Sequence, residues 1–211
     1  MKRVLCLVSS MNAGGAETFL MKIYRSLDKE KYQMDFCVNV KEKCFYDDEI
    51  NKMGGKIYYI PPKSASLSEF QNLLYNLIYE KKYDYVLRIA SSAYSFLDIK
   101  IAKDAGARHC IVRAANAGSS GGVKGYIAHL LGRMKYQKYI DTMIAPSDLA
   151  AEYTFGKRAY ESGKVNILHN AVDLNIFKYD LSDRTRIRNE FGIHDDVFLL
   201  GHVGRLNHQK N

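Results

Sequence analysis

The chain has 211 residues, of which 47% are hydrophobic, so it is long enough to bury the core of one ordinary domain. It contains three prolines and no low-complexity tract, which excludes a disordered chain or a long linker. No apolar run approaches the roughly 20 residues of a membrane-spanning helix, and the run at residues 4–8 is too short for a signal peptide. We therefore expect a soluble, cytoplasmic protein.

The formal net charge of +8 is unevenly distributed. Residues 105–140 contain no Asp or Glu, and they carry six basic side chains: Arg108, Arg113, Lys124, Arg133, Lys135 and Lys138. Such a segment suits a phosphate-bearing ligand, an anionic lipid or nucleic acid, or it forms the solvated face of a helix. No nucleic-acid-binding motif or strip of stacking aromatic residues accompanies it, so we expect no nucleic-acid partner.

The four cysteines, Cys6, Cys37, Cys44 and Cys110, form no CxxC pair and show no metal-ligand spacing. Because three of them lie in apolar, strand-like segments, we expect buried thiols rather than disulfides or a metal site. The histidines show no paired ligand spacing either. The sequence therefore predicts no metal.

Strand and helix patterns alternate along the chain. Short apolar runs predict strands at residues 3–9, 33–40, 56–60, 84–89, 108–113, 142–145, 164–168 and 197–203. Amphipathic spacing predicts helices at residues 16–27, 46–53, 67–81, 93–104, 123–139, 148–155 and 184–191. This alternation predicts an α/β fold, with a doubly wound, mostly parallel Rossmann-like sheet and helices on both faces.

Two domains are expected. Residues 1–177 would form one Rossmann-like lobe, and residues 178–211 would form a crossover and the first strand, at 197–203, of a second lobe. Ligands of such sheets lie beyond the carboxyl ends of the strands. The turns that follow strands are therefore the first places to look for a site.

The turn after the first strand contains Gly14 and Gly15 but lacks the GxGxxG spacing of a dinucleotide site. The second strand ends without an acidic residue to hold a ribose, so a nicotinamide enzyme is disfavoured. Two glycines before a helix allow close backbone approach by a ligand and expose N–H groups to an anion. A plain tight turn explains them as well.

The loop at residues 114–122 is long and rich in small residues, and it either folds over a substrate or is a mobile connection. The helix behind it carries one apolar stripe: Val123, Ile127, Leu130, Leu131 and Met134. Lys124 and Lys135 flank that stripe. We expect the stripe to pack on the core because it is narrow, and a membrane-surface face with basic margins is the alternative.

Several turns fall into one order along the chain. Residues 4–9 precede Met11-Asn12-Ala13-Gly14-Gly15-Ala16-Glu17, His169-Asn170-Ala171-Val172-Asp173 follows, and Gly201-His202-Val203-Gly204-Arg205-Leu206 precedes Lys210-Asn211. This order resembles the retaining glycosyltransferases of family four, whose two Rossmann-like lobes form the GT-B fold, and especially bacterial exopolysaccharide and capsule enzymes. The resemblance covers the whole chain and implies an acceptor-binding lobe followed by the start of a donor-binding lobe.

The resemblance also implies roles for matching residues. Gly14 and Gly15 would face the donor diphosphate, and Arg205 and Lys210 would be the catalytic cations that grip it and stabilise the leaving phosphate. Two cations that meet a diphosphate allow such an enzyme to work without a metal or other cofactor. Asn170 and Asp173 would shape the crossing between the lobes.

The chain departs from the family where relatives often carry histidines near the acceptor, after the fourth and fifth strands. The candidates for acceptor binding here are Asn12, Arg88, Arg113 and Asn116. Arg113 would bind the phosphate of a lipid-linked acceptor or form a salt bridge at a strand end. Ala171 also replaces the glycine that usually follows the asparagine at position 170.

The resemblance implies that the full-length protein transfers a hexosyl group from a nucleotide-sugar donor to a glycan or lipid-linked acceptor in polysaccharide biosynthesis, with retention. We expect peripheral contact with an anionic membrane at its inner face, and no transfer by residues 1–211 alone, because half of the cleft would be missing. The alternative is a non-catalytic module that holds anionic lipid or glycan phosphate through residues 105–140.

Overall fold

The computed structural model describes residues 1–118 and 122–204. The chain divides into two compact units, Met1–Asn170 and Ala171–Asn211. The first unit therefore ends before residue 177, where the sequence placed the boundary between lobes. A compact unit and a functional lobe need not share a boundary, so the division at 177 stays a prediction.

Within the described residues, seven strands form one sheet in which every neighbouring pair is parallel. The strands are β1 (Lys2–Leu7), β2 (Tyr32–Val38), β3 (Ile57–Tyr59), β4 (Tyr85–Ala90), β5 (His109–Ala114), β6 (Thr142–Ala145) and β7 (Val165–Ile167). Their order is β3-β2-β1-β4-β5-β6-β7, so the chain runs outward from β1 and then returns to β4 on the other side of it. The predicted doubly wound parallel sheet is confirmed.

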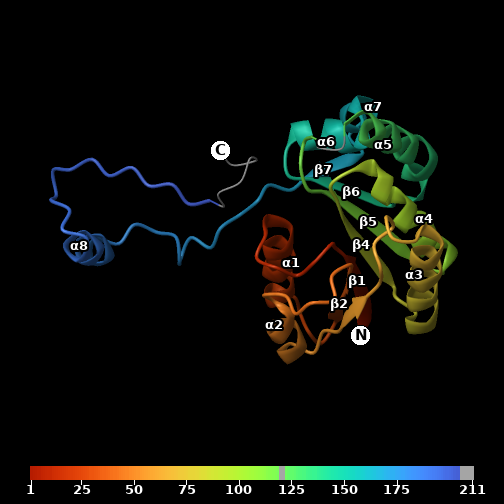
Figure 1. Cartoon of the computed structure of the whole chain (residues 1–211), viewed down its shortest axis with the longest axis horizontal. Coiled ribbons are helices and arrows are strands. Elements are labelled where there is room, and N and C mark those ends of the chain that lie inside the picture. The colour runs from red at the N-terminus through yellow and green to blue at the C-terminus, as the bar shows by residue number, and fades with distance from the viewer. Residues whose placement is uncertain (119–121, 205–211) are drawn as a thin grey trace. The chain divides into compact units, whose positions relative to one another are not determined.

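Helices cover both faces of this sheet (Figure 1). They are α1 (Gly15–Ser26), α2 (Asp47–Lys52), α3 (Leu67–Lys81), α4 (Phe96–Asp104), α5 (Gly122–Tyr136), α6 (Asp148–Phe155) and α7 (Lys157–Glu161), with short 3₁₀ turns η1 (Ala93–Ser95) and η2 (Gln137–Tyr139). The second unit contains the helix α8 (Leu181–Glu190). Ser66 and Ser147 cap α3 and α6, because each hydroxyl accepts from a backbone N–H of the first turn.

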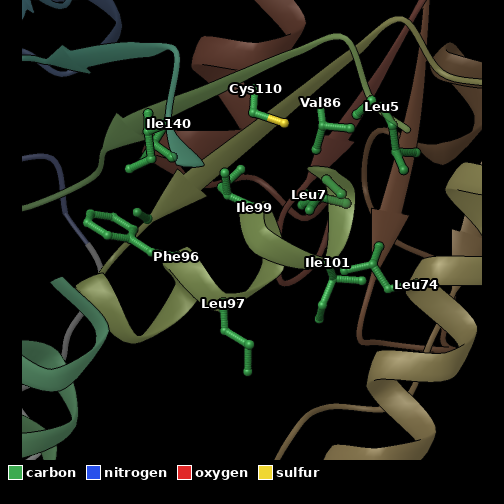
Figure 2. Packing of buried hydrophobic residues seen from close by; sticks show 14 of the residues in the cluster. Leu5, Leu7, Leu74, Val86, Phe96, Leu97, Ile99, Ile101, Cys110 and Ile140 are labelled. Atoms are coloured by element: carbon green, nitrogen blue, oxygen red, sulfur yellow. The ribbon is translucent and has the colours of Figure 1, made fainter. Parts of the chain in front are cut away.

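The core has two layers because successive side chains of a strand point to opposite faces. Leu5 and Leu7 of β1 belong to the layer that α3, α4 and α6 cover, whereas Cys6 belongs to the layer under α1 and α2. Figure 2 shows the first layer, where Phe96 and Ile99 of α4 lie among strand side chains that include Leu5, Val86 and Cys110. Burial of these side chains holds the helices on the sheet.

All four cysteines are buried and free. Burial raises the pKa of the thiols of Cys37 and Cys110 to about 12, because the thiolate is poorly solvated in an apolar layer. The prediction of buried thiols is confirmed.

The strand predicted at residues 197–203 does not form. The backbone there is irregular, and Phe198 and Leu200 expose 90% and 86% of their surface. A parallel strand is stable only when neighbouring strands accept and donate its hydrogen bonds. Among the described residues of the second unit, no other strand is present to pair with it.

The prediction that α5 packs through its apolar stripe is wrong. Val123, Ile127, Leu131 and Met134 are exposed. The buried positions are His129 and Gly132, which lie against η1. His129 accepts a hydrogen bond from the N–H of Ala93 at 3.1 Å through Nδ1, and its Nε2 is 2.9 Å from the carbonyl oxygen of Tyr153. A histidine and a glycine therefore orient this helix, and four of the five residues of the predicted stripe face outward, whereas Leu130 is half-buried.

A substitution at Gly132 tests the packing of α5 on η1. A Cβ at this position would collide with the carbonyl oxygen of Ala93 and lie 2.7 Å from its carbonyl carbon, and backbone atoms cannot rotate away. We expect Gly132→Ala to lower the free energy of unfolding by about 1–3 kcal/mol, although alanine favours a helix over glycine by about 1 kcal/mol. Urea unfolding measures the change.

Gly15→Ala is the matched control, because no atom lies within 4 Å of its Cβ position and the residue is also helical. It should not lower stability. Equal stability of both variants and the parent would contradict the close packing of α5 on η1.

Candidate functional site

The carboxyl ends of the seven parallel strands lie at one edge of the sheet, since all pairs run in the same direction. The loops that follow these strands carry most of the residues singled out from the sequence. Two clusters of buried charge lie at this edge. One is the buried Arg113 with its exposed hydrogen-bond partner Asn170, and the other contains Arg88.

In the turn after β1, the candidate residue Asn12 makes a hydrogen bond within the protein. The side-chain oxygen of Asn12 accepts from the N–H of Phe45 at 3.2 Å. Gly14 has a φ of −143°, an extended conformation open to any residue, but a Cβ there would collide with the carboxylate of Glu17. Around Gly15 there is open space. Because the Glu17 side chain is flexible and can move away, neither position requires glycine on steric grounds, and the contact of the turn with a diphosphate stays a prediction.

Arg113, the last residue but one of β5, is 3% exposed. Its Nη2 donates to Oδ1 of Asn170 at 2.7 Å, and its guanidinium carbon lies 3.7 Å from the ring centroid of Phe19. Burial lowers the pKa of Arg113, because the cation is poorly solvated. Among the described residues no carboxylate pairs with it, so the salt-bridge interpretation of Arg113 is not supported.

A pocket of about 300 Å³ lies beside this guanidinium. Its walls are mostly apolar and come from α1 and from the strands β1, β2, β4, β5 and β6, with Leu168 after β7. A buried cation at an apolar wall attracts an anionic group that carries an apolar portion. Arg113 therefore borders this pocket with Asn170 as its hydrogen-bond partner, and its contact with a ligand stays a prediction.

Arg88 belongs to the second cluster. Its Nε lies 3.1 Å from Oδ2 of Asp98, and the ammonium group of Lys63 pairs with the other carboxylate oxygen. Asp98 is fully buried, and the side chains of Lys63 and Arg88 are 12% and 14% exposed. Burial lowers the pKa of Lys63 despite this partner. The cluster carries two cations and one anion.

The sequence analysis missed Lys63 and Asp98. Lys63 follows two prolines at the end of the third strand, so its position after a strand was a usable signal. Asp98 lies in the first turn of α4 and is indistinguishable in sequence from a surface carboxylate that stabilises a helix N-terminus. Its burial follows from tertiary packing alone.

A third feature is a groove of about 890 Å³ between α5, η2, α7 and the start of β7. Its lining includes five basic residues and no acidic one: Arg133, Lys138, Lys157, Arg158 and Lys164. The exposed apolar stripe of α5 begins at its rim, where Met134 contributes to both. Of the six basic residues that the sequence analysis singled out in residues 105–140, Arg133 and Lys138 line this groove, whereas Arg113 is buried and Arg108 pairs with Asp84.

The remaining candidates are not brought into these clusters. Asn116 is exposed in the loop after β5. Asp173 lies in the second unit, where its carboxylate accepts from the N–H of Asn175 at 2.9 Å. Arg205 and Lys210 lie outside the described residues. Among the described residues, no group of three His, Cys, Asp or Glu side chains could hold a metal ion, and no helix there is long and apolar enough to cross a bilayer.

The chain is similar to known proteins in sequence and in fold. No protein-family model matches the chain. It is 29% identical over 214 residues to "putative glycosyltransferase EpsF" of Bacillus subtilis strain 168, and the match covers all of this chain and 56% of that protein.

Two solved structures show the breadth of the fold. Anabaena HepE, in complex with UDP and glucose, matches 91% of this chain and 50% of its own with a TM-score of 0.63 at 15% identity. The UDP-GlcNAc 2-epimerase of Methanocaldococcus jannaschii matches 93% and 54% with a TM-score of 0.52 at 15% identity. The chain thus has the fold of one GT-B glycosyltransferase-like lobe, and it spans about half the length of the proteins that it matches.

The buried cation of the first cluster generates a stability prediction. Arg113→Met keeps the length and apolar contacts of the side chain and removes an uncompensated charge, so the free energy of unfolding should stay equal or rise by about 1 kcal/mol. Asn170→Ala leaves Arg113 in place without its acceptor and should lower stability by about 1–2 kcal/mol. Urea midpoints measure both. A loss in Arg113→Met as large as that in Asn170→Ala would show that the guanidinium serves the fold itself.

Proposed function

We propose that the chain is the acceptor-binding lobe of a retaining glycosyltransferase of family four. The complete enzyme would move a hexosyl group from a nucleotide-sugar to a glycan or lipid-linked acceptor in polysaccharide biosynthesis. The observation that carries the proposal is the similarity to EpsF along the whole chain. The GT-B lobe fold and the buried cations at the carboxyl edge of its sheet support it.

In this proposal the described lobe holds the acceptor, and a second lobe supplies most of the donor site. Arg113, fixed by Asn170, would meet an anionic group of the acceptor. Gly14 and Gly15 would admit the donor diphosphate close to the backbone. Arg205 and Lys210 would stabilise the negative charge that develops on the leaving diphosphate, which is the work of a metal in other transferases. No cofactor is proposed.

The main rival for the same fold is epimerisation of a nucleotide-sugar, because the M. jannaschii epimerase shares it. The two activities differ in their need for an acceptor. A transferase releases nucleoside diphosphate and forms a glycosidic bond, whereas an epimerase converts the donor alone. An assay that follows both donor and acceptor products therefore separates them.

The test compares residues 1–211 with the uninterrupted reading frame of the gene, using UDP-, GDP- and ADP-linked hexoses and a lipid-linked acceptor extract. We expect transfer by the longer protein only, with the anomeric configuration of the product equal to that of the donor by NMR, and with loss of transfer in Arg113→Met. Transfer by residues 1–211 alone, or donor epimerisation without transfer, would contradict the proposal.

A second proposal concerns the membrane. The exposed residues Val123, Ile127 and Met134 form an apolar face on α5, and the basic groove lies beside it. An apolar helix face with basic margins binds the interface of an anionic bilayer, where apolar side chains insert and lysines meet phosphate groups. We infer that α5 docks the protein on such a surface, in the complete enzyme or, as the alternative, in a non-catalytic lipid-binding module.

Flotation with vesicles of phosphatidylcholine and phosphatidylglycerol tests this docking. The charge reversal of Lys124, Lys135 and Lys138 to Glu should weaken binding by at least roughly 100-fold, since the loss of three basic residues that contribute about 1 kcal/mol each gives that factor and the three carboxylates add repulsion. Binding of the parent should also fall as salt rises.

The matched control reverses three lysines that lie on and near α1 and α2, Lys31, Lys43 and Lys52, and gives the same net charge. It should float as the parent does. Equal loss in both variants would mean that net charge, not the α5 surface, drives binding. Flotation without transferase activity in the longer protein would favour the binding module.

A further inference from the structure

A polar pocket of about 300 Å³ opens at the carboxyl edge of the sheet, next to the cluster of Lys63, Arg88 and Asp98. Residues from four successive strand ends line it: Ser9 after β1, Asn39 after β2, Lys63 after β3, and Arg88 and Ser91 at the end of β4. The pocket therefore spans the point between β1 and β4 where the strand order reverses, and crevices at such points bind ligands in α/β proteins.

The charges of this pocket are unbalanced. The single carboxylate of Asp98 pairs with both Lys63 and Arg88, so the cluster keeps one positive charge in excess. Two neighbouring cations in a partly buried site repel each other, and a shared carboxylate holds them together without neutralising both. A second anion in the pocket would complete the balance.

The donors of the pocket are also incompletely used. Arg88 faces Asp98 through Nε, and among the described residues no hydrogen bond from its two terminal nitrogens is present. The ammonium group of Lys63 lies 5.0 Å from the ring centroid of Phe70 and 4.9 Å from that of Tyr94, so aromatic faces flank it. In the described part of the chain, the side-chain hydroxyl groups of Ser9, Ser64 and Ser91, which line the pocket, make no hydrogen bond to another residue. These groups suit an oxyanion surrounded by hydroxyls.

We propose that this pocket is a subsite for one phosphoryl group of a sugar phosphate or a phosphorylated glycan, held by Lys63 and Arg88. Guanidinium and ammonium groups bind phosphate oxygens with charge-assisted hydrogen bonds. The serine hydroxyls and Asn39 would face the sugar. This inference rests on the proposed function only for its assignment to the acceptor, since the binding itself requires no second lobe.

The competing explanation is a structural ion cluster that fixes α4 to β3 and β4. Lys63→Met distinguishes the two, because it removes the excess charge and leaves the pair of Arg88 and Asp98 intact. A structural role alone would change stability but not the response to phosphate. The matched control is Lys41→Met, because Lys41 is exposed near the same edge and does not line the pocket.

The experiment uses calorimetric titration of the whole chain with inorganic phosphate, glucose 6-phosphate and farnesyl phosphate, at constant ionic strength. We expect glucose 6-phosphate to bind the parent and Lys41→Met equally, and to bind Lys63→Met at least about tenfold more weakly. Arg158→Met, in the basic groove, should bind as the parent does, which excludes binding there.

Three results would overturn the inference: no binding of glucose 6-phosphate to the parent, equal binding to Lys63→Met, or loss of binding in Arg158→Met instead. Stronger binding of farnesyl phosphate than of glucose 6-phosphate would overturn the assignment to a sugar phosphate. Phosphate binding in this pocket without any transferase activity in the longer protein would leave the subsite standing and refute the transferase. Transferase activity without phosphate binding would refute the subsite and leave the proposed function standing.

Discussion

The parallel pairing of all seven strands is the constraint on which the rest of this structure depends. Each strand must be followed by a crossover before the next begins, so every loop after a strand lies at the same edge of the sheet. Residues far apart in the chain, such as Lys63, Arg88 and Arg113, lie at this edge for that reason, in two separate clusters. The return of the chain from β3 to β4 adds a crevice between neighbouring loops, and the polar pocket lies there.

The charges at this edge are buried, and removing them from water costs free energy. Arg113 is buried against Phe19 with an amide as its partner, and two cations share the buried carboxylate of Asp98. Apolar residues at these positions would serve stability equally well or better. Buried charges that do not stabilise a fold are typical of binding sites, where the ligand carries the opposite charge. The basic groove beside α5 differs, because its charges are exposed and therefore suit a surface rather than a single bound group.

The sequence predicted the sheet well, because each buried parallel strand is a short apolar run that burial alone explains. It also placed Arg88 and Arg113 near the ends of strands, where the structure has them, whereas their roles in acceptor binding stay predictions. The predictions from sequence failed where the structure of a segment depends on its contacts with another segment of the chain. Residues 197–203 have the composition of a strand but lack a neighbour among the described residues of their unit. The stripe of α5 has helical spacing, yet His129 and Gly132 fix the packed face through a hydrogen bond and a close approach that periodicity does not encode. Asp98 was missed because its burial is a property of tertiary packing.

The central claim is that the carboxyl edge of this sheet faces the nucleotide-sugar in the complete protein. Hydrogen–deuterium exchange of the uninterrupted protein, with and without UDP, GDP or ADP, tests it most directly. The claim predicts that one nucleotide slows exchange in the turn at residues 9–15, while α3 and the amino ends of the strands are unchanged. Slowed exchange confined to α3 or to the amino edge, or no change within residues 1–170 under saturating nucleotide, would contradict it.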